Sequence, residues 1–215
     1  MIYQPAGNMS EIIGLHQIKR TPWSAARQLT IDPLYLECGG PLTNTRFTKE
    51  DIECFRFGST VLQYYFFKIS RTYNLEIKNS QGKVMLIRMH TFFGIGNKRI
   101  EALFGRIYDQ IYMAYFNDMA LHYVRLLNTG LTYELAGTFI SEEGILLKNE
   151  NQLIPWARVG LASYYYSCSV YDQRDPKHSR SFDYWHDWNA SLLRAVVDYM
   201  TRKINSRKKN RLGKK

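Results

Sequence analysis

The sequence predicts an α+β protein made of two small, bent antiparallel sheets, or partial barrels, each closed by a C-terminal helix. Short apolar or alternating segments separated by turn residues recur in both halves of the 215-residue chain, as expected for antiparallel strands. Each half then changes to apolar residues at three- and four-residue steps, the spacing of an amphipathic helix. The same order of features occurs twice, which indicates a repeat of architecture despite low direct identity.

Residues 1–30 carry the weakest structural signals in the chain. A short helix is expected over residues 9–18, with Ser10 as its N-cap. A proline and a tryptophan then interrupt this pattern. We therefore expect residues 1–30 to form an arm that packs on the body through Trp23 and Leu29.

Strands are expected throughout both repeats, which we place at residues 31–129 and 130–204. Asn79-Ser80-Gln81-Gly82 has the composition of a hairpin turn, and the strand after it is expected to place Val84 and Leu86 on one face. The first repeat is expected to contain strands over residues 34–38, 47–57, 61–70, 71–77 and 83–89. The second is expected to contain strands over residues 131–139, 145–148, 159–164, 165–171 and 179–185.

A helix closes each repeat. The first is expected from Asn97 to about Asn128, with Gly130 as its stop signal. The last helix is expected to begin at the cap Asn189, and its apolar stripe comprises Leu192, Leu193, Val196, Val197 and Met200. A basic tail is expected over residues 205–215.

One run in the second repeat resembles a known family. Gly137-Thr-Phe-Ile-Ser-Glu-Glu-Gly-Ile-Leu-Leu is followed, after a polar turn, by Ile154-Pro-Trp-Ala-Arg-Val. This is similar to bacterial pleckstrin-homology-like domains, in which a Glu/Asp-Gly-Ile hairpin precedes an Ile-Pro-Trp turn. The resemblance covers residues 131–204, and more loosely 34–128, and implies two such domains in tandem. The chain lacks the membrane helices of some such proteins and a clear basic phosphoinositide loop.

The residues of this motif also have direct physical interpretations. Gly144 is expected to supply the positive φ of a tight turn. Pro155 fixes φ at the beginning of a strand, where a missing N–H is tolerated. Trp156 is large enough to fill one open end of a small barrel. All three roles are structural.

No motif predicts chemistry. The three cysteines are odd in number and widely spaced, so we expect buried thiols in a reducing compartment at Cys38, Cys54 and Cys168. The pair Gly94-Ile-Gly96 fits a turn before a helix better than a phosphate loop. A polar cluster lacks a third metal ligand at a familiar spacing and fits a strand end and helix cap equally well; it comprises His178, Asp183, His186 and Asp187. We therefore predict no metal, no cofactor, no small-molecule substrate and no enzymatic activity; a site assembled from distant residues is the alternative, without support from any motif.

The charge of the chain is concentrated at its end. The net charge is +10, and the last fifteen residues contain no acid and eight basic residues: Arg202, Lys203, Arg207, Lys208, Lys209, Arg211, Lys214 and Lys215. Such a segment binds nucleic-acid phosphates or anionic lipid headgroups, or is simply a solvated end. No signal peptide and no apolar run of roughly 20 residues is evident. We expect a cytoplasmic protein, with a peripheral position at the inner membrane surface as the alternative.

Runs of tyrosine are the strongest indication of a binding surface. They comprise Tyr64-Tyr65 and Tyr164-Tyr165-Tyr166. Neighbouring residues on a strand point to opposite faces, so each run is expected to expose at least one ring. The sequence therefore predicts a non-catalytic interaction or scaffold module that binds another protein through exposed aromatics and sheet edges. The alternatives are a nucleic-acid-associated protein that uses the basic tail and a peripheral membrane adaptor.

Overall fold

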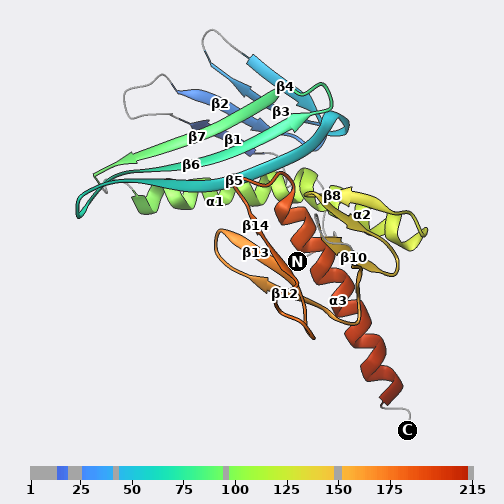
Figure 1. Ribbon diagram of the computed structural model, residues 1–215. Helices are drawn as coiled ribbons and strands as arrows, with labels where there is room; N and C mark the ends of the chain where they lie inside the picture. The colour runs from blue at the N-terminus through green and yellow to red at the C-terminus, as the bar shows by residue number, and fades with distance from the viewer. Residues whose placement is uncertain (1–13, 19–25, 41–43, 94–96, 148–151, 213–215) are drawn as a thin grey trace. The chain divides into compact units, whose positions relative to one another are not determined.

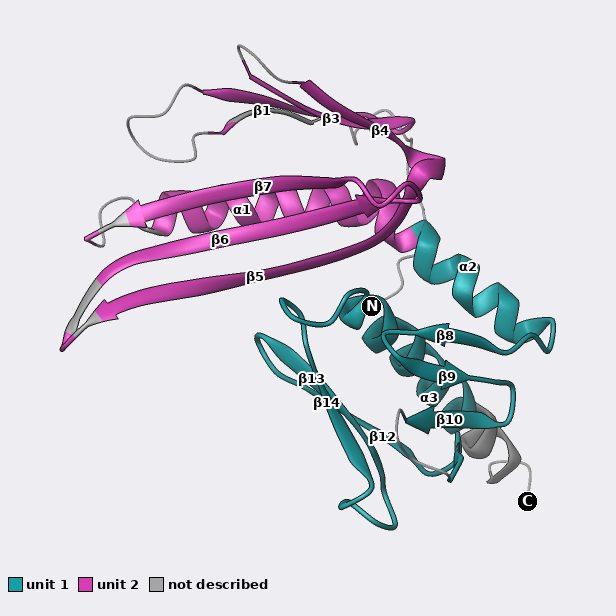
Figure 2. Ribbon diagram, turned by 45° about the horizontal axis from the view of Figure 1, so that its top comes forward, with its two compact units in different colours: residues 1–4, 118–215 teal, residues 5–117 magenta. Residues whose placement is uncertain are grey.

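The computed structural model describes residues 14–18, 26–40, 44–93, 97–147 and 152–212 (Figure 1). These residues form a mixed α+β structure with four small antiparallel sheets and few helices, which confirms the predicted class. The chain divides into two compact units, one around residues 5–117 and one around residues 118–215 (Figure 2). We call them the N-terminal unit and the C-terminal unit.

The N-terminal unit contains two sheets, whereas the sequence predicts one. The first comprises β1 (Gly14–Ile18), β2 (Arg27–Ile31), β3 (Tyr35–Gly39) and β4 (Asn44–Thr48). The second comprises β5 (Ile52–Tyr64), β6 (Phe67–Asn79) and β7 (Val84–Phe92). A 3₁₀ turn, Lys49–Asp51, separates them, and the Thr48 hydroxyl donates to Asp51 Oδ2 at 2.7 Å. This turn ends one sheet before the next begins.

Part of the expected N-terminal arm belongs to the first sheet. β1 pairs antiparallel with β2, so the helix predicted over residues 9–18 is wrong over 14–18. The backbone N–H and C=O groups of β2 gain partners from β1, and this pairing outweighs a weak local helix signal. Leu29 is fully buried on β2, whereas Trp23 lies outside the described residues.

Apolar side chains at alternate positions of β6 and β7 form the core face of the second sheet. β6 buries Tyr73, Leu75 and Ile77, and their partners across the ladder on β7 are Met89, Ile87 and Met85, which are also buried. Val84 and Leu86 share one face of this strand, as predicted, but it is the more exposed face, and Met85 and Ile87 face the core. A shift of one residue exchanges the two faces of a strand.

A helical segment follows β7. It comprises α1 (Asn97–Ile111), a π-helical turn (Tyr112–Phe116) and α2 (Asn117–Asn128). Within the N-terminal unit, the hydroxyl of buried Tyr115 lies 2.6 Å from the carbonyl oxygens of Asp32 and Tyr35 in the turn between β2 and β3. The two compact units divide between Asn117 and Asp118, whereas the sequence analysis places the end of the first repeat at residue 129.

The end of α2 confirms the predicted stop signal. Gly130 adopts φ 78°, and its N–H donates to the carbonyl of Leu127 at 3.1 Å. The N–H of Leu131 donates to the carbonyl of Leu126 at 3.2 Å. This pair of bonds is a Schellman motif, which needs a residue that tolerates positive φ.

The C-terminal unit also contains a four-stranded and a three-stranded sheet. The first comprises β8 (Tyr133–Leu135), β9 (Thr138–Ile140), β10 (Gly144–Leu147) and β11 (Ile154–Pro155). The second comprises β12 (Val159–Ser163), β13 (Ser167–Asp172) and β14 (Ser179–Asp183). The single strand predicted over residues 131–139 is wrong because Ala136 and Gly137, with φ of 52° and 67°, form a tight hairpin turn within it.

The last helix, α3 (Ala190–Leu212), begins directly after Asn189 and contacts β8, β12 and β13. Residues 205–212, expected as a basic tail, continue this helix. Both units thus contain a four-stranded sheet, a three-stranded sheet and then a helical segment in chain order. Within the described part of the chain, no sheet closes into a barrel.

Candidate functional site

The most exposed apolar residues of the N-terminal unit lie at the turn between β5 and β6. Phe66 is 93% exposed and Tyr65 is 75% exposed, and they are the two residues between the paired ends of the strands. Leu62 is also exposed, as is Phe93, whose N–H donates to the Ile69 carbonyl at 2.7 Å. We call this surface the β5–β6 tip, and it comprises Val61, Leu62, Tyr65, Phe66 and Phe93.

The backbone at this tip is not optimised for a turn. Tyr65 adopts φ 50° and Phe93 adopts φ 48°, a region in which a bulky residue is an outlier. A two-residue hairpin turn with positive φ at its first central residue favours glycine at that position for this reason. The pairing register also shifts between Leu62 and Gln63, and the Gln63 side-chain amide donates to the Tyr65 carbonyl at 3.0 Å. Bulky residues that adopt an unfavourable backbone conformation while exposed to solvent indicate selection for a function and not for folding.

The C-terminal unit has an aromatic turn between β12 and β13, which we call the β12–β13 tip (Tyr164, Tyr165 and Tyr166). All three side chains are exposed, Tyr165 to 72%. The rings of Tyr165 and Tyr166 meet edge to face, with centroids 4.5 Å apart. The N–H of Tyr164 donates to the Ser167 carbonyl at 2.8 Å, and the N–H of Tyr184 donates to the Tyr166 carbonyl at 3.0 Å.

These positions correct the strand assignment of the tyrosines. The sequence places Tyr164 in one strand and Tyr165 and Tyr166 in the next, with rings alternating between faces. The structure places all three between β12 and β13, where alternation does not apply. Tyr65 likewise lies in a turn, and Tyr64, the last residue of β5, has a side chain outside the described part.

The two tips occupy equivalent places in their own units. Each joins the first and second strands of the three-stranded sheet, and each places adjacent aromatic residues in the connection: Tyr65 and Phe66 in one, Tyr164, Tyr165 and Tyr166 in the other. Sequence reasoning missed Phe66, Phe93 and Leu62. The aromatic run over residues 61–70 contains no glycine or asparagine, so it was assigned to a strand rather than to a hairpin.

The basic segment of α3 is described only in part. Arg202 Nε donates to Asp198 Oδ1 at 2.8 Å, and Lys203 Nζ donates to Asn128 Oδ1 at 2.8 Å. Both cations thus already have polar partners within the C-terminal unit. The side chains of the remaining predicted anion-binding residues lie outside the described part: Arg207, Lys208, Lys209, Arg211, Lys214 and Lys215.

In the polar cluster before α3, the Asp183 carboxylate caps backbone N–H groups of the turn that follows β14. Asp183 Oδ1 accepts the backbone N–H groups of Trp185 and His186 and lies 2.9 Å from His186 Nδ1. Although partial burial opposes it, these hydrogen bonds hold the pKa of Asp183 below its ordinary value. Among the described residues, no three His, Cys, Asp or Glu side chains are placed to hold a metal ion. Residues 94–96, the predicted glycine turn, lie outside the described residues.

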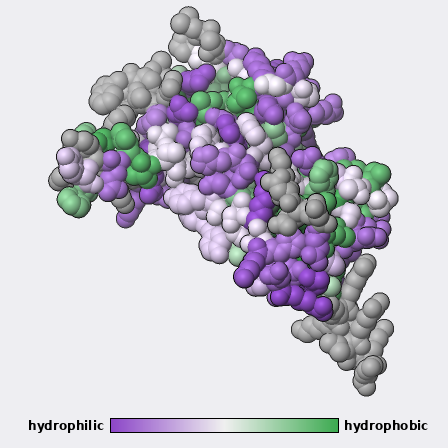
Figure 3. Space-filling model, viewed as in Figure 1, coloured by the Kyte–Doolittle hydropathy of each residue, from purple (hydrophilic) through white to green (hydrophobic). Residues whose placement is uncertain are grey.

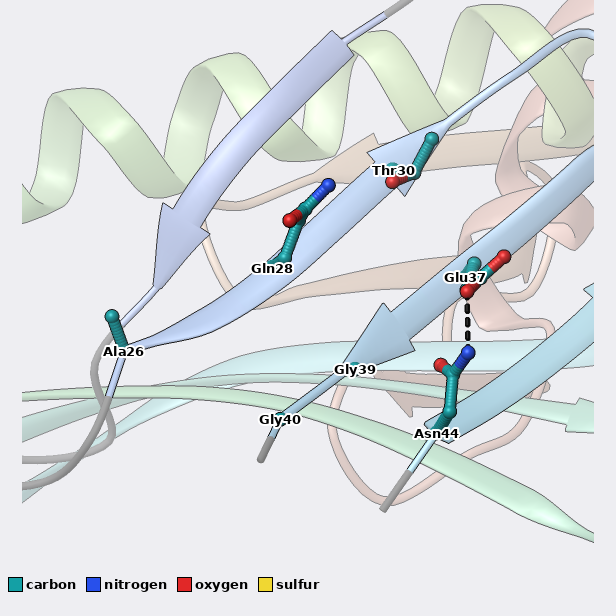
Figure 4. Close-up of a pocket in the computed structure, with 7 residues that line it drawn as sticks. All are labelled: Ala26, Gln28, Thr30, Glu37, Gly39, Gly40 and Asn44. Carbon is teal, nitrogen blue, oxygen red and sulfur yellow. Dashed lines mark hydrogen bonds between the residues drawn. The ribbon is translucent and has the colours of Figure 1, made fainter. Parts of the chain in front are cut away.

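A shallow polar depression of about 380 Å³ lies over β2, β3 and the start of β4 (Figure 4). Asn44 Nδ2 donates to Glu37 Oε1 across its floor. Its lining combines amide, hydroxyl and carboxylate groups with two glycines and offers neither a nucleophile–base pair nor a cation; it comprises Ala26, Gln28, Thr30, Glu37, Gly39, Gly40 and Asn44. We assign no chemistry to it.

The thiols are buried, as the sequence predicts, and their burial makes stability depend on pH. Burial raises the pKa of Cys168 from its ordinary value of 9.0 to about 11, with Tyr184 and Arg194 partly opposing this effect. The contribution of the protonated thiol to stability is complete below about pH 9 and is lost as the pH rises towards 11, on the order of 2–3 kcal/mol.

We therefore expect the midpoint of thermal unfolding, followed by circular dichroism, to fall between about pH 9 and pH 11. The variant Cys168→Ala removes the ionisable group, so its midpoint should fall less steeply over the same range. A wild-type midpoint that is constant over this range would contradict the assignment. Iodoacetamide should alkylate Cys168 only when the protein is unfolded.

Comparison with protein-family models finds no match to this chain, and comparison with curated protein sequences also finds none. Among the described residues, no helix combines the length and apolarity needed to cross a bilayer.

Proposed function

We propose that this protein is a non-catalytic interaction module with two pleckstrin-homology-like units in tandem. Support for the repeat comes from the shared order of a four-stranded sheet, a three-stranded sheet and a helical segment. Further support comes from the Glu143-Gly144-Ile145 hairpin and the Ile154-Pro155-Trp156 turn of the C-terminal unit, which carry the family resemblance.

One observation carries the binding role: both units place adjacent, exposed aromatic residues in the equivalent hairpin turn. Folding alone favours small or polar residues in such turns. Exposed aromatic side chains instead supply large contact areas with few rotatable bonds, and they are enriched where proteins bind other molecules.

The β12–β13 tip has the chemistry of a protein-binding surface. The strands and turn over residues 159–171 contain no charged residue. Asp183 ends β14, and Asp187 follows it in the connection to α3. Tyrosine rings combine an apolar face with a hydroxyl that donates and accepts hydrogen bonds, which suits a mixed protein surface. The edge strands β12 and β14 lie beside this tip and offer backbone groups to an extended segment of the partner. The basic segment of α3 adds attraction to anionic surfaces.

The test compares full-length variants as bait in a native extract at low and high salt. We expect Tyr165→Ser/Tyr166→Ser to reduce capture of the specific protein partner at least about tenfold, because anchoring aromatics dominate interface energies. Both side chains are exposed, so thermal stability should change little. Lys177→Ala, in the next turn of the same sheet, is the matched control and should capture normally.

A variant with Arg207, Lys208, Lys209 and Arg211 changed to Gln separates the basic segment from the folded body. We expect it to retain the protein partner, since the tip is unaltered. Equal capture by the tip variant, or a measured turnover that depends on His186 or Cys168, would overturn the proposed function. Loss of all binding in the Gln variant alone would assign the function to nucleic acid or lipid contact by the tail.

A further inference from the structure

The two tips differ in chemistry, and the difference concerns the kind of surface each can bind. The β5–β6 tip carries valine, leucine and phenylalanine side chains as well as one tyrosine. Figure 3 shows hydrophobic residues gathered at this end of the N-terminal unit. The β12–β13 tip carries only tyrosines, and residues 159–171 around it contain no charged residue.

Basic residues flank the β5–β6 tip in the sequence. Residues 61–72 and 90–100 contain no acid and four basic residues, Lys68, Arg71, Lys98 and Arg99; the side chain of Lys68 lies outside the described part, and the next residue, Glu101, is acidic. Lys98 and Arg99 are exposed in the first turn of α1, which contains no acid. Figures 1 and 2 both place this end of α1 at the same end of the sheet as the β5–β6 turn. Positive charge opposes the helix dipole in a first turn, so these two residues are not there to stabilise α1.

We propose that the β5–β6 tip inserts into the interfacial region of an anionic phospholipid bilayer, with Lys98 and Arg99 at the headgroups. The inference rests on the proposed binding role of the tips but not on the protein partner of the β12–β13 tip. A two-residue turn is narrow enough for Phe66 and Leu62 to enter the boundary between headgroups and acyl chains. Amphipathic membrane-binding segments combine such apolar side chains with flanking cations.

The charge pattern favours a bilayer over a protein as the occupant of this tip. Lysine is depleted at the centres of protein interfaces, whereas the negative potential of an anionic leaflet attracts lysine and arginine. Phenylalanine and leucine have no polar group to satisfy on insertion, and a tyrosine ring is suited to the boundary itself. The apolar side chains of the tip therefore suit the acyl-chain region of a bilayer, and the cations suit its anionic headgroups.

The test uses the full-length chain and phosphatidylcholine vesicles with and without phosphatidylserine, in a flotation assay. We expect wild-type protein to float only with phosphatidylserine vesicles. Leu62→Ser/Phe66→Ser should weaken partitioning at least about tenfold, because two apolar side chains no longer enter the interface. Lys98→Gln/Arg99→Gln should weaken it about tenfold at low salt and less at high salt, where screening already reduces attraction.

Fluorescence reporters locate the inserted surface. Phe66→Trp should shift its emission to the blue with anionic vesicles and be quenched by brominated lipid. Gln81→Trp, in the turn at the opposite end of the same sheet, should show neither change. The variant with glutamine at positions 207, 208, 209 and 211 should still float, which separates the tip from the basic segment.

Two results would overturn the inference: flotation that the Leu62/Phe66 variant retains in full, or a Phe66→Trp reporter that stays unquenched on vesicles. Loss of a captured protein by the Leu62/Phe66 variant, with no vesicle binding by wild type, would assign the tip to a protein instead. The Tyr165→Ser/Tyr166→Ser variant should float normally. Failure of its protein capture test therefore does not bear on the lipid result, and the two proposals fail separately.

Discussion

Replacing Trp156 by alanine is expected to lower the free energy of unfolding by about 3–5 kcal/mol, the cost of removing a large buried aromatic side chain. Trp156 is only 4% exposed, and its indole N–H donates to the Ser141 carbonyl at 2.9 Å. Its backbone N–H also donates to the Glu143 carbonyl at 3.3 Å. The side chain thus links the turn between β9 and β10 to the segment after β11. Its loss leaves both a cavity and a Ser141 carbonyl without a hydrogen-bond donor.

A conservative variant separates these two effects. Trp156→Phe retains much of the apolar volume but leaves the Ser141 carbonyl without its donor, which costs about 1–3 kcal/mol. Urea denaturation followed by far-ultraviolet circular dichroism measures both variants against wild type. A Trp156→Ala variant within about 1 kcal/mol of wild type would show that the site collapses around the missing ring.

Introducing a single methyl group at Gly144 is expected to be nearly as damaging, at about 3 kcal/mol. Gly144 lies on β10 opposite Pro155 of β11. A Cβ at this position would overlap the backbone carbonyl of Ile154 and lie 2.9 Å from Pro155 Cα. Because the obstacle is backbone rather than side chain, Gly144→Ala must separate the two strands to be accommodated.

Gly160→Ala is the matched control for this prediction. Gly160 also lies on a strand, opposite Tyr171, and an added Cβ would meet only the ring of that tyrosine. A partly buried ring at the surface can rotate away, so we expect a loss of about 1 kcal/mol. The comparison is made by thermal unfolding of both variants. Equal losses would indicate that the β10–β11 backbone is more adaptable than its close approach suggests.

These glycines illustrate which features a sequence can reveal. Gly130 was predicted correctly because an end of helix followed by glycine is a local signal. The positive φ predicted for Gly144 is wrong, because positive φ among the described glycines occurs at Gly82, Gly130 and Gly137. Gly144 is required by the approach of β11, a partner strand that begins ten residues later. Pro155, predicted at the beginning of a strand, is instead the last residue of the two-residue β11, which lies at the edge of its sheet.

The difference between local signals and pairing with a distant strand also explains which strand features were predicted. The turn over residues 79–82 and the α1–α2 segment follow from short-range composition and spacing, and both were predicted. The inner face of β7 was not, because residues 84–87 are all apolar and only pairing with β6 selects Met85 and Ile87 for the core. β1 was missed for a related reason, since its strand conformation depends on β2. The tips were found only as aromatic runs, because their turns lack the residues that normally indicate turns.

The unusual turn at Tyr65 has a consequence for laboratory evolution of this protein. Positive φ at a bulky residue costs about 1 kcal/mol or more, which glycine at position 65 would relieve. A library selected for thermal tolerance alone should therefore accumulate substitutions at this turn early. The resulting proteins would be more stable to heat but would have lost exposed aromatic side chains of the β5–β6 tip. Sequencing the selected variants would reveal the positions at which thermal stability and binding favour different residues.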